Sequence, residues 1–221
     1  MSIFELFAQS YPQLLEGLWV TIQATLVSLA IAMVLGLLFG LMSVSHSKIV
    51  RGIARVYVDI IRGTPLIVQA FFIYFGVTAA LGIRMEPLTA GIITLTLNAG
   101  AYLAEIVRAG IQSVDKGQME AARSLGLPHT MAMTKVILPQ AVRTMIPAIV
   151  NQFIITLKDS SILSVIGMAD LTQAGKLIIA RNFESFNMWL IVGAMYFVII
   201  MILSKISIYI EGRMSYGQSK N

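Results

Sequence analysis

The chain has 221 residues, of which 57% are hydrophobic and only 12% are charged, and its formal net charge is +5. Because soluble globular domains carry about 25% charged residues, a mean hydropathy of +0.81 excludes an ordinary soluble domain and indicates a polytopic membrane protein. The lack of cysteine excludes disulfides and thiolate metal sites, and His46 and His129, both expected in solvated loops, are too few for a metal site.

The first expected elements are a surface segment and a long apolar helix. Residues 1–16 are amphipathic and are expected to lie on the outer membrane surface. Residues 17–45 carry no charge, and since about 20 apolar residues span a bilayer as a helix, the first span is placed at 15–44. This run begins too far inside the chain, and is too long, for a cleavable signal peptide. Its Gly36 and Gly40 form a small-xxx-small step that serves either packing within the chain or a dimer contact.

Four further spans are expected, at 52–82, 86–111, 140–166 and 185–210. The fourth is interrupted by Lys158 and Asp159 and is read as one helix with a polar interruption. Short connections make neighbouring helices antiparallel. Residues 1–221 are therefore predicted to form a single all-α transmembrane domain with five spans.

Lysine and arginine residues set the predicted orientation, because they concentrate on the cytoplasmic side. Only Arg84, Lys158, Lys176 and Arg181 fall on the outer side or within the fourth span if the N-terminus is outside and the C-terminus inside. The cytoplasmic segments then hold Lys48, Arg51, Arg55, Arg108, Lys116, Arg123, Lys135, Arg143, Lys205, Arg213 and Lys220. The net positive charge follows from this bias and does not indicate nucleic-acid binding.

A short polar segment at 115–136 separates the third and fourth spans. Asp115 followed by Gln118 resembles a capping box, which starts a helix. Gly126 stands where a left-handed residue ends a helix, and Pro128 follows it. The spacing predicts a cytoplasmic helix of about ten residues, or roughly 15 Å.

Met119, Ala122 and Leu125 form one apolar stripe on this short helix. A second short stretch, 129–136, is expected to end at Leu138-Pro139, where the chain returns to the membrane. Periodicity alone favours an ordinary loop helix lying on the lipid surface.

Polar residues within the spans are candidates for a cavity. Charged groups there cost roughly 2.5–3.5 kcal/mol and usually face a partner or water. The alternatives are interhelical hydrogen bonds, a structural ion pair of Lys158 with Asp159, or snorkelling at a helix end. For Arg62, at the cytoplasmic end of its helix, snorkelling is favoured over gating, and for Glu105 with Arg108 a surface pair is favoured. The candidates are Thr64 and Gln69 on the second span, Asn98 and Tyr102 on the third, and Lys158, Asp159 and Ser160 on the fourth.

The cytoplasmic segment also carries a specific pattern. Glu120-Ala121-Ala122, then Gly126, then Val136-x-Leu138-Pro139 resembles the E-A-A-x3-G-x9-I-x-L-P signature of permease subunits of ATP-binding cassette importers, with only Val136 departing from it. Further segments resemble the polar amino acid branch of that family: RGTPLIVQ at 62–69, AYLAEIVRAGIQSV at 101–114, LPQAVR at 138–143 and KDSSILSVIG at 158–167.

This resemblance implies a type I importer in a bacterial cytoplasmic membrane. Such a system has two permease subunits, either two copies or a homologous pair, a dimer of ATPase subunits, and an extracytoplasmic amino acid-binding protein. The sequence has no Walker motif, so ATP and Mg²⁺ are expected on the ATPase, and no cofactor on this chain. The resemblance implies that a short segment couples to the ATPase, and its residues are Gly117, Glu120, Ala121, Ala122 and Gly126.

The expected function is the permease subunit of an ATP-driven importer for polar L-amino acids of the glutamine, cystine or arginine type, working by alternating access. Lys158 would meet a substrate carboxylate, and Asp159 a substrate ammonium group. One alternative is an ATP-independent amino acid carrier or channel, which leaves the capped helix unexplained. A membrane-embedded enzyme is a second alternative, but the chain offers no catalytic histidine, cysteine or carboxylate pair.

Overall fold

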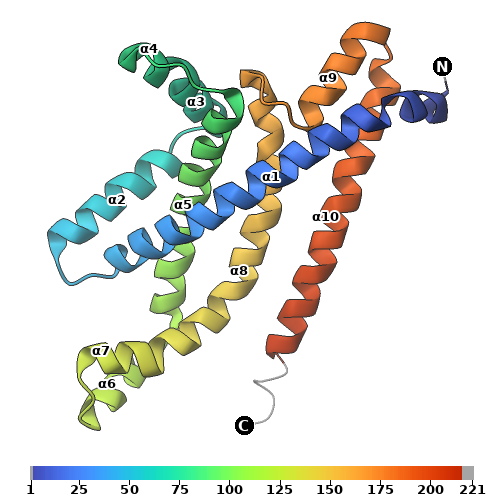
Figure 1. Ribbon diagram of the computed structural model, residues 1–221. Helices are drawn as coiled ribbons and strands as arrows, with labels where there is room; N and C mark the ends of the chain where they lie inside the picture. Colours follow the sequence, from blue (N-terminus) through green and yellow to red (C-terminus); the bar gives the residue numbers. More distant parts are fainter. Residues whose placement is uncertain (1, 216–221) are drawn as a thin grey trace.

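The computed structural model describes residues 2–215, and within that range every regular element is helical (Figure 1). Lys220 lies outside the described residues. The elements are α1 (Ile3–Ser43), α2 (Lys48–Arg62), α3 (Leu66–Phe71), the π-helical η1 (Phe72–Val77), α4 (Thr78–Leu81), α5 (Pro87–Ser113), α6 (Lys116–Ser124), α7 (His129–Ala132), the π-helical η2 (Met133–Ile137), α8 (Leu138–Asp159), the 3-10 helix η3 (Ser160–Ile166), α9 (Leu171–Asn182) and α10 (Ser185–Ser215). Four helices are long and apolar enough to cross a membrane, and a bent pair makes five. The expected all-α membrane fold is confirmed.

Helix α1 contains 41 residues, so its length of roughly 62 Å is about twice the hydrocarbon thickness of a bilayer. It starts at a capping box between Ser2 and Glu5 and continues through Pro12. The first turns therefore continue into the spanning helix as one element, and the expectation that residues 1–16 lie on the outer membrane surface stays a prediction. Leu6 and Leu14 are fully buried in one cluster with residues of α9 and α10, and Figure 1 shows the first turns bent away from the direction of the rest of α1. Figure 1 shows α1 running obliquely across the upright helices.

The close approach of α1 to α5 uses the small-xxx-small step. A Cβ atom on Gly36 would lie 2.4 Å from Cβ of Leu103, and one on Gly40 would lie 2.5 Å from Cβ of Val107. The Ser28 hydroxyl adds a bond to the carbonyl of Ile92 at 3.2 Å. The step thus serves packing within the chain.

The second expected span, 52–82, is broken. Helix α2 and the α3–η1–α4 segment meet at 102°, because Pro65 has no N–H group and disfavours a helical residue before it. The amide of Gln69 donates to the carbonyls of Ile61 at 2.7 Å and Thr64 at 3.0 Å. This side chain therefore satisfies backbone groups that the break exposes.

The fourth span differs in the opposite way, because it is longer than expected. Helical structure continues from His129 to Ile166, so the expected stop at Leu138-Pro139 is wrong. Pro139 lies in the first turn of α8, directly after η2, where a missing N–H group is tolerated. Ile137 and Met145, on either side of Pro139, are buried in one cluster with Val107 and Ile111 of α5. This packing holds the start of α8 against α5.

Helix α9 was not predicted from the sequence. It contains 12 residues and is followed by Phe183, a C-cap residue with a φ of 61°. Lys176 and Arg181 make this stretch too polar, and its length too short, for a span. Figure 1 shows α9 at the opposite end of the bundle from α6 and α7.

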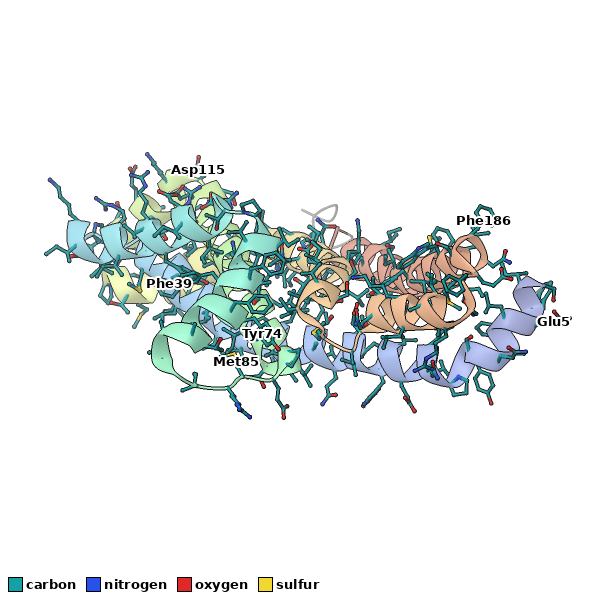
Figure 2. The ribbon with its side chains drawn as sticks, turned by 90° about the horizontal axis from the view of Figure 1, so that it is seen from above. Glu5, Phe39, Tyr74, Met85, Asp115 and Phe186 are labelled. Carbon is teal, nitrogen blue, oxygen red and sulfur yellow. The ribbon has the colours of Figure 1, made fainter. Side chains whose placement is uncertain are left out.

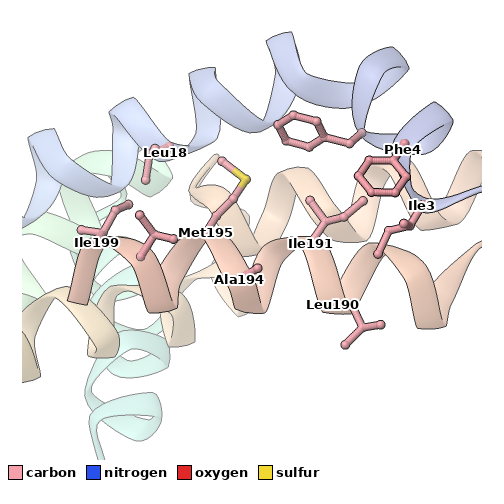
Figure 3. A pocket seen from close by; sticks show the side chains of 10 residues that line it. Ile3, Phe4, Leu18, Leu190, Ile191, Ala194, Met195 and Ile199 are labelled. Carbon is pink, nitrogen blue, oxygen red and sulfur yellow. The ribbon is translucent and has the colours of Figure 1, made fainter. Parts of the chain in front are cut away.

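An apolar groove separates the first turns of α1 from α10. Its volume is about 510 Å³, and Figure 3 shows Ile191 and Met195 of α10 projecting toward α1. We call it the α1–α10 groove, and its lining consists of Ile3, Phe4, Phe7, Leu18, Leu190, Ile191, Ala194, Met195, Val198 and Ile199. Such a lining matches lipid chains and offers no polar group to a solute.

Candidate functional site

The first candidate surface is α6, which begins at a side-chain cap. The Asp115 carboxylate accepts a bond from the N–H of Gly117 at 2.7 Å, so the predicted helix start is confirmed. A Cβ atom on Gly117 would lie 2.8 Å from that carboxylate, which explains why glycine suits the position. The reciprocal half of the expected capping box is replaced, because Gln118 instead accepts a bond from Gln140 at 3.5 Å.

The far end of α6 is a Schellman motif, as the position of Gly126 predicts. Gly126 has a φ of +86°, a left-handed conformation that costs other residues roughly 1–2 kcal/mol. Its N–H group donates to the carbonyl of Arg123 at 3.0 Å, and that of Leu127 donates to Ala122 at 3.2 Å. Both bonds satisfy carbonyls that would otherwise be unpaired, so α6 is a short helix fixed at both ends.

The exposed face of α6 differs from the predicted one at a single residue. Ala122 is buried, and Met119 packs against the cluster around Ile111 and Ile137, as the stripe predicts. Leu125, however, is 83% exposed, because it follows the last helical residue and the chain turns there. Glu120 and Ala121 are also exposed. Sequence analysis missed Leu125 as part of the outward surface.

A second candidate group lies at the break between α2 and α3. The amide nitrogen of Gln69 donates to the hydroxyl of Thr64 at 2.9 Å, and the amide of Asn98 donates to Gln69 at 3.2 Å. Gln69 and Asn98 are buried, whereas Thr64 is exposed. The structure thus connects three of the predicted pathway residues in one hydrogen-bonded chain that runs from the α2–α3 connection through α3 to α5.

Lys158, Asp159 and Ser160 mark the point where α8 tightens into η3. Lys158 is exposed, Asp159 is half-buried, and Ser160 is fully buried with its hydroxyl donating to the carbonyl of Leu157 at 2.7 Å. Ser160 is therefore occupied within its own helix, while the two charged side chains are more accessible. Helix α3 and η3 pack through a shared cluster that includes Ala70 and Leu163, which brings the Gln69 group and this pair onto neighbouring elements.

The structure gives Arg62 a different environment from the expected snorkelling position. Its guanidinium carbon lies 5.1 Å from the centre of the Tyr102 ring, within cation–π range, and its Nη1 lies 3.9 Å from Glu105. Glu105 also accepts two bonds from Arg108, which in turn contacts Gln112. Arg62 and the Glu105–Arg108 pair, predicted as separate surface features, are therefore parts of one cluster on α2 and α5.

A buried acid between the fourth and fifth spans was missed. Asp170 is fully buried and caps α9 by accepting from the N–H groups of Gln173 at 3.0 Å and Thr172 at 3.2 Å. The hydroxyl of Tyr196 also donates to it at 3.3 Å. Burial raises the pKa of the Asp170 carboxyl, although these donors act in the opposite direction. The start of α9 could have been predicted from the sequence, because aspartate is a typical N-cap residue and Asp170 precedes a polar stretch of twelve residues.

Metal-binding clusters of three or more histidine, cysteine or acidic residues are not found within residues 2–215. His46 and His129, from the α1–α2 connection and the start of α7, make an edge-to-face ring contact with centroids 5.4 Å apart.

Comparison with known proteins decides the family. Residues 16–216 match the family described as the binding-protein-dependent transport system inner membrane component. The chain belongs to this family of permeases. The resemblance expected from the E-A-A segment is thereby confirmed.

Relatives of the permease cover nearly its whole length. The glutamine transport system permease protein GlnP of Escherichia coli (strain K12) is 42% identical over 204 residues, covering 92% of this chain and 93% of that protein. The arginine transport system permease protein ArtQ of Bacillus subtilis (strain 168) is 37% identical over 211 residues, covering 94% and 96%.

Solved structures agree with the fold of the permease. A crystal structure of an amino acid ABC transporter with histidines matches with a TM-score of 0.91 and 42% identity, covering 96% of this chain and 99% of the other. The MetNI methionine ABC transporter in an inward-facing conformation matches with a TM-score of 0.79 at 22% identity, covering 91% and 96%, which supports the fold alone.

Proposed function

We propose that this permease is the membrane-spanning subunit of an ATP-driven importer for polar amino acids, in a bacterial cytoplasmic membrane, with its N-terminus outside. It works by alternating access with a second permease, either another copy or a homologue. A pair of ATPase subunits binds ATP and Mg²⁺ on the cytoplasmic side, and an extracytoplasmic binding protein delivers the amino acid. The glutamine, arginine and histidine named for its relatives support this substrate class.

One observation carries the proposal: α6 is fixed at both ends and presents a small outward face. Glu120, Ala121 and Leu125 are exposed on it. Leu125 supplies an apolar contact, Ala121 permits close approach, and Glu120 offers a carboxylate to a donor on the ATPase. In this proposal the ATPase covers the Leu125 side chain, which is 83% exposed in the permease alone.

The substrate path in this proposal runs past the junction of α8 and η3. Lys158 would bind the α-carboxylate and Asp159 the ammonium group of a free amino acid. Thr64, Gln69, Asn98 and Tyr102 shape the wall of the path, and Ser160 supports it from its buried position.

The coupling test uses the complete complex in liposomes with ATP inside. The measured quantity is the ratio of radiolabelled amino acid taken up to ATP hydrolysed. We expect Glu120→Gln and Gly126→Ala each to lower this ratio at least tenfold. Lys135→Gln is the matched control, because Lys135 is also an exposed charge close to α6, and it should leave the ratio unchanged. Transport by the permease without an ATPase would contradict the proposal and support a carrier or channel.

A panel of glutamine, cystine and arginine identifies the substrate. Lys158→Gln or Asp159→Asn should abolish uptake without releasing the ATPase.

A further inference from the structure

A polar pocket of about 370 Å³ lies between α2, α5 and the end of α1. Four arginines line it against two carboxylates, so it carries an excess of two positive charges. We call it the α2–α5 pocket, and its lining consists of Ser43, Arg51, Arg55, Val58, Asp59, Arg62, Glu105, Arg108 and Gln112. Its volume is within the range of about 300–1,000 Å³ for pockets that hold small molecules.

The pocket lies on the polar side of a helix with two distinct faces. Arg51, Arg55, Asp59 and Arg62 are spaced three or four residues apart and therefore share one face of α2. On the other side of the same helix, an apolar row is exposed: Ile49, Ile53, Val56 and Ile60. Charged side chains within a span face water or protein, whereas an exposed apolar row suits lipid. The pocket thus opens away from the lipid-type face, which favours a dissolved solute over a lipid headgroup.

Most charges in the pocket already have partners. Glu105 is bound by Arg108 and lies near Arg62, and Arg51 donates to the carbonyl of Ser45 at 2.8 Å. Arg55 and Asp59 differ, because their side chains make no hydrogen bond or ion pair with any other residue in the described part of the chain. Both are exposed to the pocket and lie one helical turn apart, where side chains are neighbours.

A free guanidinium group and a free carboxylate one turn apart match the two charges of a free amino acid. The α-carboxylate would pair with Arg55 and the α-ammonium group with Asp59. We propose that Arg55 and Asp59 form a second amino acid-binding site in the half of the permease next to α6, which the substrate occupies after leaving Lys158 and Asp159. This inference rests on the proposed transport function. The excess positive charge makes the site prefer glutamate and glutamine over lysine.

The test measures amino acid binding to the complete complex without the binding protein. The complex is held in nanodiscs of phosphatidylcholine, and binding of radiolabelled glutamine is followed by scintillation proximity. We expect the Lys158→Gln, Asp159→Asn double variant to keep a residual binding component. Adding Arg55→Gln and Asp59→Asn to it should weaken that component at least tenfold, while adding Lys48→Gln, another cationic residue of α2, should not. Glutamate should displace the residual glutamine at a concentration at least threefold lower than lysine does.

Several results would overturn the second site. These are loss of all binding in the Lys158→Gln, Asp159→Asn variant, residual binding that Arg55→Gln and Asp59→Asn leave unchanged, or lysine displacing glutamine as well as glutamate does. A lipid headgroup site is indicated instead if phosphatidylglycerol in the nanodisc abolishes the residual component. Uptake by the unaltered complex in liposomes is measured in parallel. If the complex takes up amino acid with ATP but the residual binding component is missing, only this inference is overturned. Absence of ATP-dependent uptake overturns the transport function itself.

Discussion

The α2–α5 pocket, of about 370 Å³, and the α1–α10 groove, of about 510 Å³, are two openings with opposite chemistry. The pocket is lined mainly by charged side chains, and the groove only by apolar ones. Figure 2, which views the molecule from above, shows α2 and Phe39 in one half, and Glu5 and Phe186 in the other. Helix α1 reaches both regions, with Ser43 in the pocket and Ile3, Phe4, Phe7 and Leu18 in the groove. The difference indicates that the pocket suits water or a polar solute, whereas the groove suits lipid chains.

The largest expected effect comes from placing the same charge in both regions. Ala194→Arg puts a guanidinium group at the α1–α10 groove, where an arginine in hydrocarbon costs roughly 2.5–3.5 kcal/mol. Gln112→Arg puts it at the edge of the α2–α5 pocket, where the bond from Arg108 is lost but the new group remains beside polar groups and carboxylates. We expect Ala194→Arg to lower expression and the melting temperature of the complex strongly, and Gln112→Arg to change them little. Equal effects would remove the distinction between lipid and water sides.

A glycine exchange tests the seam between α1 and α5 that supports the pocket. Gly40→Val would force Cβ to within 2.5 Å of Cβ of Val107 and 2.9 Å of the carbonyl of Ala104. Overpacking of this kind costs about 1–3 kcal/mol. Gly193→Val on α10 is the control, since no atom lies within 4 Å of its Cβ position. Thermal unfolding of the two variants in detergent should differ by several degrees, and a stable Gly40→Val variant would show that the seam can open.

The cluster on α5 should make a smaller contribution. Glu105→Gln leaves Arg108 and Arg62 without their carboxylate. These side chains are about one-third exposed, so solvent screening limits the expected loss to about 1 kcal/mol. Glu16→Gln, an exposed acid on α1, is the control and should not change the unfolding temperature. An equal loss in both variants would indicate a general charge effect.

The smallest expected effect concerns Asp170, the buried acid that caps α9. Burial raises the pKa of its carboxyl above 3.8, so the folded state binds the proton more tightly than the unfolded state does. Its contribution to stability is therefore largest at low pH and falls as the pH rises through the raised pKa. Asp170→Asn keeps a capping oxygen but removes this titration. The melting temperature of the unaltered permease should fall relative to Asp170→Asn between pH 4 and pH 7, and parallel curves would contradict the raised pKa.

Features that depend on local sequence could be predicted. The apolar runs gave the spanning helices, and Asp115 with Gly126 gave both ends of α6, because a cap involves residues only two to five positions apart. Features set by distant contacts could not. Arg62 does end α2, as expected, but only the approach of α5 shows that it lies over Tyr102 and beside Glu105.

The polar groups show the same limit. Asn98 and Gln69 were recognised as polar residues in spans, but their mutual bond depends on how far α3 turns at Pro65. Asp170 was missed because its burial follows from the packing of α9 against α1 and α10. Hydropathy reports whether a residue suits lipid, and it does not report which helix lies next to it.

The unbroken helix from His129 to Ile166 has a mechanical consequence. Its 38 residues follow a helical path of roughly 57 Å along the axis, and Figure 1 shows this path curving between α7 and the upper part of α8. In the proposed importer, an ATPase that moves the α7 end would therefore act on the η3 end through continuous helical structure, without an intervening loop. We expect such a movement to shift Lys158 and Asp159 together, so that the paired charges keep their spacing while the opening around them changes.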